Sequence, residues 1–166
     1  CEVSGQGQIP VARGCAAPKS PITHHPTVAV HGPNGFGALS RREVRGRALA
    51  EDAADFLIRQ TREAPGEVVV VALGPLTNIA EALQRDPGFA DRIGHLYIMG
   101  GAFRAPGNVT RFAEANIHND PMSADLVARG IAKATWVGLD VTDKIVLSPA
   151  DLAALCAPGT ETCRFI

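Results

Sequence analysis

Apolar residues occur along the chain in short continuous runs, which are separated by longer stretches with helical periodicity. Four such runs lie at residues 27–30, 68–73, 96–99 and 135–139. Because the runs are apolar throughout rather than alternating, they predict strands that are buried on both faces, as in a parallel sheet. A further short strand is expected near residues 8–11, within an otherwise irregular segment 1–26 that is rich in Gly, Pro, Ser and His.

Helices are predicted in the stretches between these runs. Residues 40–43 (Ser-Arg-Arg-Glu) are a candidate capping box, and apolar residues then recur at helical spacing at Leu49, Ala53, Phe56 and Leu57. A second helix is expected to carry the apolar side chains of residues 79–83 and to stop near Pro87.

Two later helices have start signals that combine a capping side chain with a proline. Asp120 followed by Pro121 predicts an N-cap and a first helical position, in a helix that extends to about Arg129. Ser148 followed by Pro149 predicts another start of the same kind. Both predictions rest on contacts within a few residues of the helix end.

Strands that alternate with helices predict right-handed βαβ units. We therefore expect an α/β fold with an open, mostly parallel sheet and helices on both faces. No internal repeat or linker divides residues 1–166, so a single domain is expected. The chain begins with Cys1 rather than Met and stops at Ile166 just after a helical segment, which indicates a partial domain, truncated at both ends.

Composition excludes several classes of protein. The 166 residues are 46% hydrophobic, which is too apolar for disorder, and the formal net charge of −1 gives no basic surface for nucleic acid. The longest apolar run, residues 68–73, is too short to span a membrane. The four cysteines form no CxxC pair and no zinc-ligand spacing, so we expect reduced thiols in a cytoplasmic protein.

Candidate ligand-binding residues follow the predicted strands, where open α/β sheets bind their ligands. The densest polar segment, residues 107–121, is neither a periodic helix nor a strand, and long irregular loops in compact domains are usually functional or disordered. Its amides and carboxylates suit a polyhydroxylated ligand. The alternative is that these side chains only satisfy backbone groups in a long turn, and the residue pattern leaves both interpretations open.

Four blocks of sequence stand in a recognisable order along the chain. The first is Ala-Leu-Gly-Pro-Leu-Thr-Asn-Ile-Ala at residues 72–80, and the second is Met-Gly-Gly at 99–101. The third lies within residues 107–121, and the fourth is Gly-Leu-Asp-Val-Thr at 138–142. In order and spacing these blocks resemble the inosine–uridine-preferring nucleoside hydrolases, and the resemblance extends from about residue 9 onward.

The resemblance implies an enzyme that cleaves the N-glycosidic bond of a ribonucleoside to release ribose and the free base. In that family a calcium ion binds two ribose hydroxyls and a water, and an aspartate deprotonates that water. Matching positions imply substrate contacts to ribose hydroxyls from Asn108, Glu114 and Asn116. They also imply packing of Met99 against the sugar, a place for His31 in a mobile loop over the base, and a main-chain carbonyl from Thr77 for calcium. A helix-start role for the Thr77 hydroxyl is the competing interpretation.

Two parts of the family pattern have no counterpart in the sequence. These are an Asp-rich motif that supplies the catalytic base and two calcium carboxylates, and a later His-Asp pair. We therefore expect no catalytic residue in these 166 residues, no activity from them alone, and an exposed sheet edge that promotes aggregation.

The resemblance implies a nucleoside as partner and a homo-oligomer for the full-length form, without nucleic-acid or membrane partners. The alternative to a segment of an active hydrolase is a non-catalytic remnant that acts as a binding or structural fragment. An unrelated α/β enzyme is disfavoured, because no predicted strand end carries a nucleophile elbow or a phosphate-binding loop.

Overall fold

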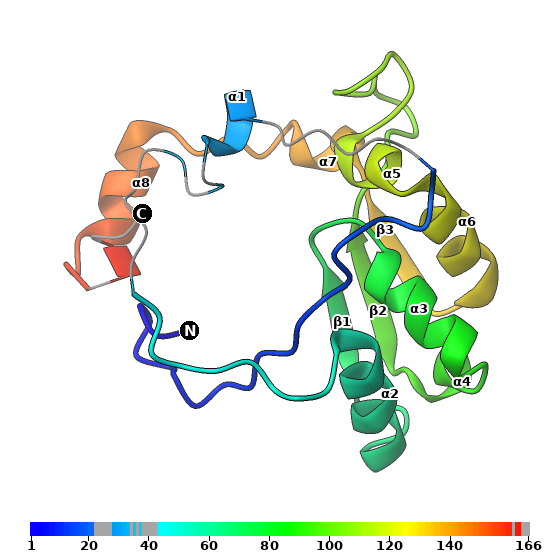
Figure 1. Ribbon diagram of the computed structural model, residues 1–166. Helices are drawn as coiled ribbons and strands as arrows, with labels where there is room; N and C mark the ends of the chain where they lie inside the picture. The colour runs from blue at the N-terminus through cyan, green and yellow to red at the C-terminus, as the bar shows by residue number, and fades with distance from the viewer. Residues whose placement is uncertain (22–27, 34, 36, 38–42, 161, 164–166) are drawn as a thin grey trace.

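A three-stranded parallel sheet forms the centre of the molecule (Figure 1). The computed structural model describes residues 1–21, 28–33, 35, 37, 43–160 and 162–163. The strands follow one another in the order β1 (Val69–Ala72), β2 (His95–Met99) and β3 (Ala134–Val137). The parallel α/β sheet expected from the sequence is confirmed.

Helices precede the first strand, connect the strands and follow the last one. In chain order they are α1 (Val28–His31), α2 (Ala53–Glu63), α3 (Thr77–Arg85), α4 (Phe89–Arg92), α5 (Ala115–Asn119), α6 (Pro121–Gly130), α7 (Leu139–Thr142) and α8 (Pro149–Cys156). Helix α3 contacts both α2 and α6. Within the described part of the chain, no helix is long and apolar enough to cross a membrane.

The core lies on one face of the sheet. Leu96 and Ile98 of β2 are fully buried there, in one apolar cluster with side chains from α2, α3, α4 and α6. On the opposite face Val69, Val71 and Tyr97 are 55%, 61% and 44% exposed. Helices were expected on both faces, but the described helices that pack in this core cover only one. The other face is therefore open to solvent, although continuously apolar strands are usually buried on both faces.

The prediction of a strand at residues 27–30 is wrong for those of its residues that the structure describes. Val28–His31 form the short helix α1, and residue 27 lies outside the described residues. An apolar run of four residues carries no period that distinguishes a strand from a helix, and no neighbouring strand pairs with it here. The run at 135–139 is a strand only as far as Val137, because Leu139 already begins α7.

Near the N-terminus the pairing differs from the expectation. Residues 8–11 form no strand, and the nearest pairing is an isolated parallel bridge between Arg13 and Asp52. Helices α1 and α8 stand away from the sheet, whereas α2, which also precedes β1, packs in the core (Figure 1).

The helix expected after residue 40 begins later than its candidate capping box. Residues 40–42 lie outside the described residues, and Glu43 and Leu49 have no helical structure. Asp52 is the N-cap of α2, where its side chain accepts a hydrogen bond of 3.0 Å from Asp55 N. The expected helix starts at Pro121 and Pro149 are confirmed, and Ser148 completes a capping box with its N3 residue.

Candidate functional site

The polar residues singled out from the sequence meet at the carboxyl ends of β1 and β2, around the start of α5. Glu114 is the N-cap of α5 and only 2% exposed. Its Oε1 accepts from Asn116 N at 2.9 Å, and its Oε2 accepts from Ile117 N at 3.2 Å and from Gly101 N at 3.1 Å. The carboxylate therefore joins the end of β2 to the first turn of α5.

Glycines allow the backbone to approach this carboxylate closely. A Cβ on Gly100 would lie 3.0 Å from Ile117 Cδ1, and Gly101 has a φ of +90°, a conformation that side chains rarely adopt. A Cβ on Gly107 would lie 2.4 Å from the backbone of Ala113. These three glycines let the chain after β2 fold back onto α5.

Two asparagines complete the network. Asn108 Oδ1 accepts from Ala115 N at 2.9 Å, while Asn116 Nδ2 donates to Met99 O at 3.0 Å and lies 3.3 Å from Met99 Sδ. Among the described residues, Asn108 Nδ2 and Asn116 Oδ1 form no hydrogen bond. One donor and one acceptor therefore remain, which is the pairing that a sugar hydroxyl needs.

A second buried carboxylate, Asp120, lies at the other end of α5. Its Oδ2 accepts from Thr77 Oγ1 and Ser123 Oγ at 2.6 Å and from Lys19 N at 2.9 Å. Its Oδ1 accepts from Ser20 Oγ at 2.7 Å, from Ser20 N at 3.1 Å and from Ser123 N at 3.3 Å. Burial raises the pKa of Asp120, but hydrogen bonds from the side chains of Ser123, Thr77 and Ser20 and from the backbone of Lys19 outweigh it and hold the pKa well below its ordinary value.

The structure brings most of the predicted residues together. Met99, Asn108, Glu114 and Asn116 form one hydrogen-bonded network, and Thr77 is joined to the far end of α5 through Asp120. His31 lies exposed on α1, which Figure 1 shows apart from α5. The sequence predicted Asp120 as a helix cap and as part of the polar segment 107–121, but not its bonds to Ser20 and Thr77, because these partners are distant along the chain.

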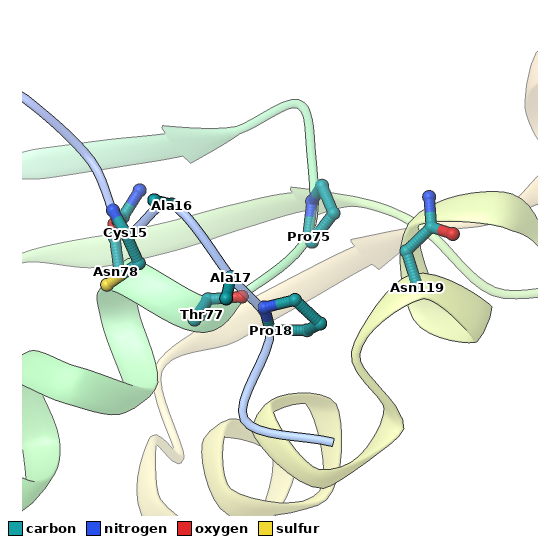
Figure 2. A pocket seen from close by; sticks show the side chains of 8 residues that line it. All are labelled: Cys15, Ala16, Ala17, Pro18, Pro75, Thr77, Asn78 and Asn119. Atoms are coloured by element: carbon teal, nitrogen blue, oxygen red, sulfur yellow. The ribbon is translucent and has the colours of Figure 1, made fainter. Parts of the chain in front are cut away.

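A pocket lies beside this network (Figure 2). It is lined by the N-terminal segment and by the chain around the starts of α3 and α6, at Cys15, Ala16, Ala17, Pro18, Pro75, Thr77, Asn78 and Asn119. Cys15 N donates to Asn78 Oδ1 at 2.7 Å, and this bond holds the N-terminal segment against α3. The segment is thus a wall of the pocket, a role that its irregular sequence did not indicate.

Comparison with known proteins matches the chain to one family. A family model described as "Inosine-uridine preferring nucleoside hydrolase" matches residues 1–166. The chain belongs to the nucleoside hydrolase family. It is 44% identical over 158 residues to uridine nucleosidase 1 of Arabidopsis thaliana, covering 93% of this chain and 46% of that protein.

Solved structures of nucleoside hydrolases share the fold. A purine-preferring ribonucleoside hydrolase from Gardnerella vaginalis superposes with a TM-score of 0.92 at 32% identity, over 99% of this chain and 53% of that one. The plant nucleoside hydrolase PpNRh1 gives a TM-score of 0.88 at 36% identity, over 99% and 52% of the two chains. The chain thus spans about half the length of the relatives that it matches.

Nucleoside hydrolases act with a metal ion, which needs a set of donor groups in the protein. Within the described ranges, no group of three or more His, Cys, Asp or Glu side chains could hold a metal. Thr77 begins α3 and its hydroxyl donates to Asp120, while the role of its main-chain carbonyl as a metal ligand stays a prediction. The side chains that the structure describes therefore do not fit a complete metal site by themselves.

Proposed function

We propose that this nucleoside hydrolase chain is the ribose-binding part of an enzyme that cleaves ribonucleosides to ribose and free base. The network of Glu114, Asn108 and Asn116 at the carboxyl edge of the sheet supports this proposal. It combines a buried carboxylate with an amide donor and an amide acceptor that have no partner among the described residues. Relatives with uridine and with purine in their names both match, so the proposal concerns the ribonucleoside class.

The chemistry of the three side chains fits a ribose better than an apolar ligand. Cleavage of an N-glycosidic bond builds positive charge on the sugar ring, as in other glycoside hydrolyses. A carboxylate that accepts from a sugar hydroxyl is attracted more strongly to that charged ring than to the neutral substrate. Glu114 would therefore bind the transition state more tightly than the ground state, which is the difference that accelerates a reaction.

The rigidity of the network serves the same end. Glu114 is held by three backbone N–H groups, so little reorganisation is needed when the sugar arrives. Asn116 is fixed by Met99, whose half-buried side chain lies next to it and would contact the sugar. Calcium as the metal and a homo-oligomeric assembly belong to the same proposal and rest on the family resemblance alone. A cytoplasmic location is also proposed, and it rests on the cysteine pattern.

The test compares two forms of the protein with inosine and uridine as substrates, following release of the free base. The first form is the 166-residue chain, and the second is the protein as isolated from its source cells. We expect hydrolysis by the source-cell protein, loss of about two orders of magnitude in Glu114→Ala, and little loss in the distant surface variant Arg129→Ala. An inactive source-cell protein would instead favour a non-catalytic remnant.

A further inference from the structure

Helix α5 is held at both ends by a buried carboxylate. Glu114 caps its start and ties it to Gly101 at the end of β2. Asp120, which is fully buried, follows its last residue and ties it to Thr77 at the start of α3. Because α5 has only five residues, it is too short to keep its orientation without such contacts. The direction of Asn116 therefore depends on both ends.

Helix capping alone does not account for the contacts of Asp120. As the N-cap of α6 it needs only the backbone N–H of Ser123, which lies 3.3 Å from Oδ1. Its shorter bonds, at 2.6 and 2.7 Å, include those from Thr77 Oγ1 and Ser20 Oγ, which lie 43 and 100 residues away along the chain. These bonds connect three segments that meet beside the sugar-binding network.

The same carboxylate also holds one wall of the pocket in Figure 2. Lys19 N and Ser20 N donate to Asp120 directly after the lining residues 15–18, and Cys15 N donates to Asn78 at the other end of that segment. Lys19 Nζ forms an ion pair with Glu81 of α3 as well. Asp120 thus fixes the relative positions of the N-terminal segment, α3 and α5.

We propose that Asp120 is a positioning residue: its bonds to Thr77 and Ser20 hold α5 so that Glu114 and Asn116 are oriented before a sugar binds. This inference rests on the proposed function for its catalytic consequence, but not for its structural part. Preorganisation of this kind removes an ordering cost from the binding and reaction steps. Loss of the Thr77 or Ser20 bond would free α5 without removing any group that touches the sugar.

The test uses Asp120→Asn and Thr77→Val, with Asp52→Asn as the matched control. Asp52 is also an N-cap carboxylate, but it caps α2 and does not contact α5. Valine has the shape of threonine and lacks the hydroxyl that donates to Asp120, whereas Thr77→Ser keeps that hydroxyl and serves as the rescue variant. If Asp120→Asn fails to fold, Thr77→Val carries the test.

The first readout is amide hydrogen exchange at Gly101, Asn116 and Ile117, whose backbone N–H groups donate hydrogen bonds to Glu114. In the 166-residue chain we expect exchange about tenfold faster in Asp120→Asn and Thr77→Val, and protection restored in Thr77→Ser. Unchanged exchange in the first two variants, relative to Asp52→Asn, would overturn the proposal.

The second readout is catalysis by the protein from source cells, at a temperature where every variant is fully folded. We expect kcat/KM to fall about tenfold in Asp120→Asn, mostly through kcat, and to stay near wild type in Asp52→Asn. A lower Tm with unchanged kcat and KM would reduce Asp120 to a structural cap and overturn the effect of its positioning role on catalysis. Faster amide exchange in a protein that hydrolyses no nucleoside would keep the positioning role and reject the proposed function.

Discussion

The backbone N–H of Gly101 donates a hydrogen bond of 3.1 Å to Glu114 Oε2, which connects the end of β2 to the start of α5. The two residues are separated by a loop that folds back on itself, with Val109 N donating to Ala113 O at 3.1 Å. Glu114 thereby has two roles: it satisfies backbone donors at a helix start, and it places a carboxylate at the ligand-binding edge of the sheet.

Substitution of Glu114 should separate these two roles. In the source-cell protein, Glu114→Gln keeps one acceptor oxygen for the backbone, so we expect stability to fall less than in Glu114→Ala, which leaves buried N–H groups unpaired at a cost of about 1–3 kcal/mol. Both variants remove the negative charge, and we expect both to lose roughly a hundredfold in kcat/KM. A loss below about threefold in folded Glu114→Gln would mean that the carboxylate acts only as a helix cap.

Gly101 should tolerate no side chain. Its φ of +90° strains any L residue, and a Cβ would lie 3.3 Å from the ring of Phe103. We expect Gly101→Ala to lower the free energy of unfolding by at least 1–2 kcal/mol, roughly the cost of a left-handed conformation. Gly66→Ala is the control, because Gly66 has a φ of +79° and open space around its Cα. Equal losses in the two variants, by urea unfolding, would show that the Phe103 contact costs nothing.

The lowered pKa of Asp120 predicts a pH dependence of stability. Its ordinary value is 3.8, and the folded state holds the pKa lower, so its stabilising contribution is present above about pH 4 and is lost as the pH falls through the folded pKa. Urea unfolding at pH 7 and pH 3 should show that the gap in stability between wild type and Asp120→Asn narrows at the lower pH. A gap that stays constant would mean that the pKa is not lowered.

Calcium binding should be weak in the 166-residue chain. The described residues contain no cluster of three acidic or metal-ligating side chains, and calcium takes about six to eight oxygen ligands. We expect calorimetric titration with calcium chloride to give no micromolar affinity, and no change in Tm at millimolar calcium. Micromolar binding would show that this chain holds a donor set that its described geometry lacks.

The open face of the sheet should promote self-association of the isolated chain. Val69, Val71 and Tyr97 expose apolar surface there, next to the edge of β1, with which no strand pairs in the described part of the chain. Val71→Lys places a charge on this face and should lower the aggregated fraction by severalfold in light scattering. The control Val28→Lys changes another exposed valine away from the sheet, and an equal effect there would assign the association to net charge instead.

Local sequence signals predicted the elements whose determinants lie within a few residues. Asp120 with Pro121 and Ser148 with Pro149 predicted two helix starts, since capping bonds span about three residues. The apolar runs at 68–73 and 96–99 predicted β1 and β2. The run at 27–30 did not predict its structure, because a short apolar segment becomes a strand only when a neighbouring strand pairs with it.

The sequence by itself determined the α/β class, the main strands and the sugar-binding candidates Asn108, Glu114 and Asn116, because periodicity, caps and motif order are readable along one dimension. Only the tertiary structure decided that Glu114 is buried and accepts a hydrogen bond from Gly101, that one sheet face is open, and that Asp120 joins segments up to 101 residues apart. Hydrogen bonds between distant segments form only after the chain has folded, and no local pattern encodes which donors a buried carboxylate will find.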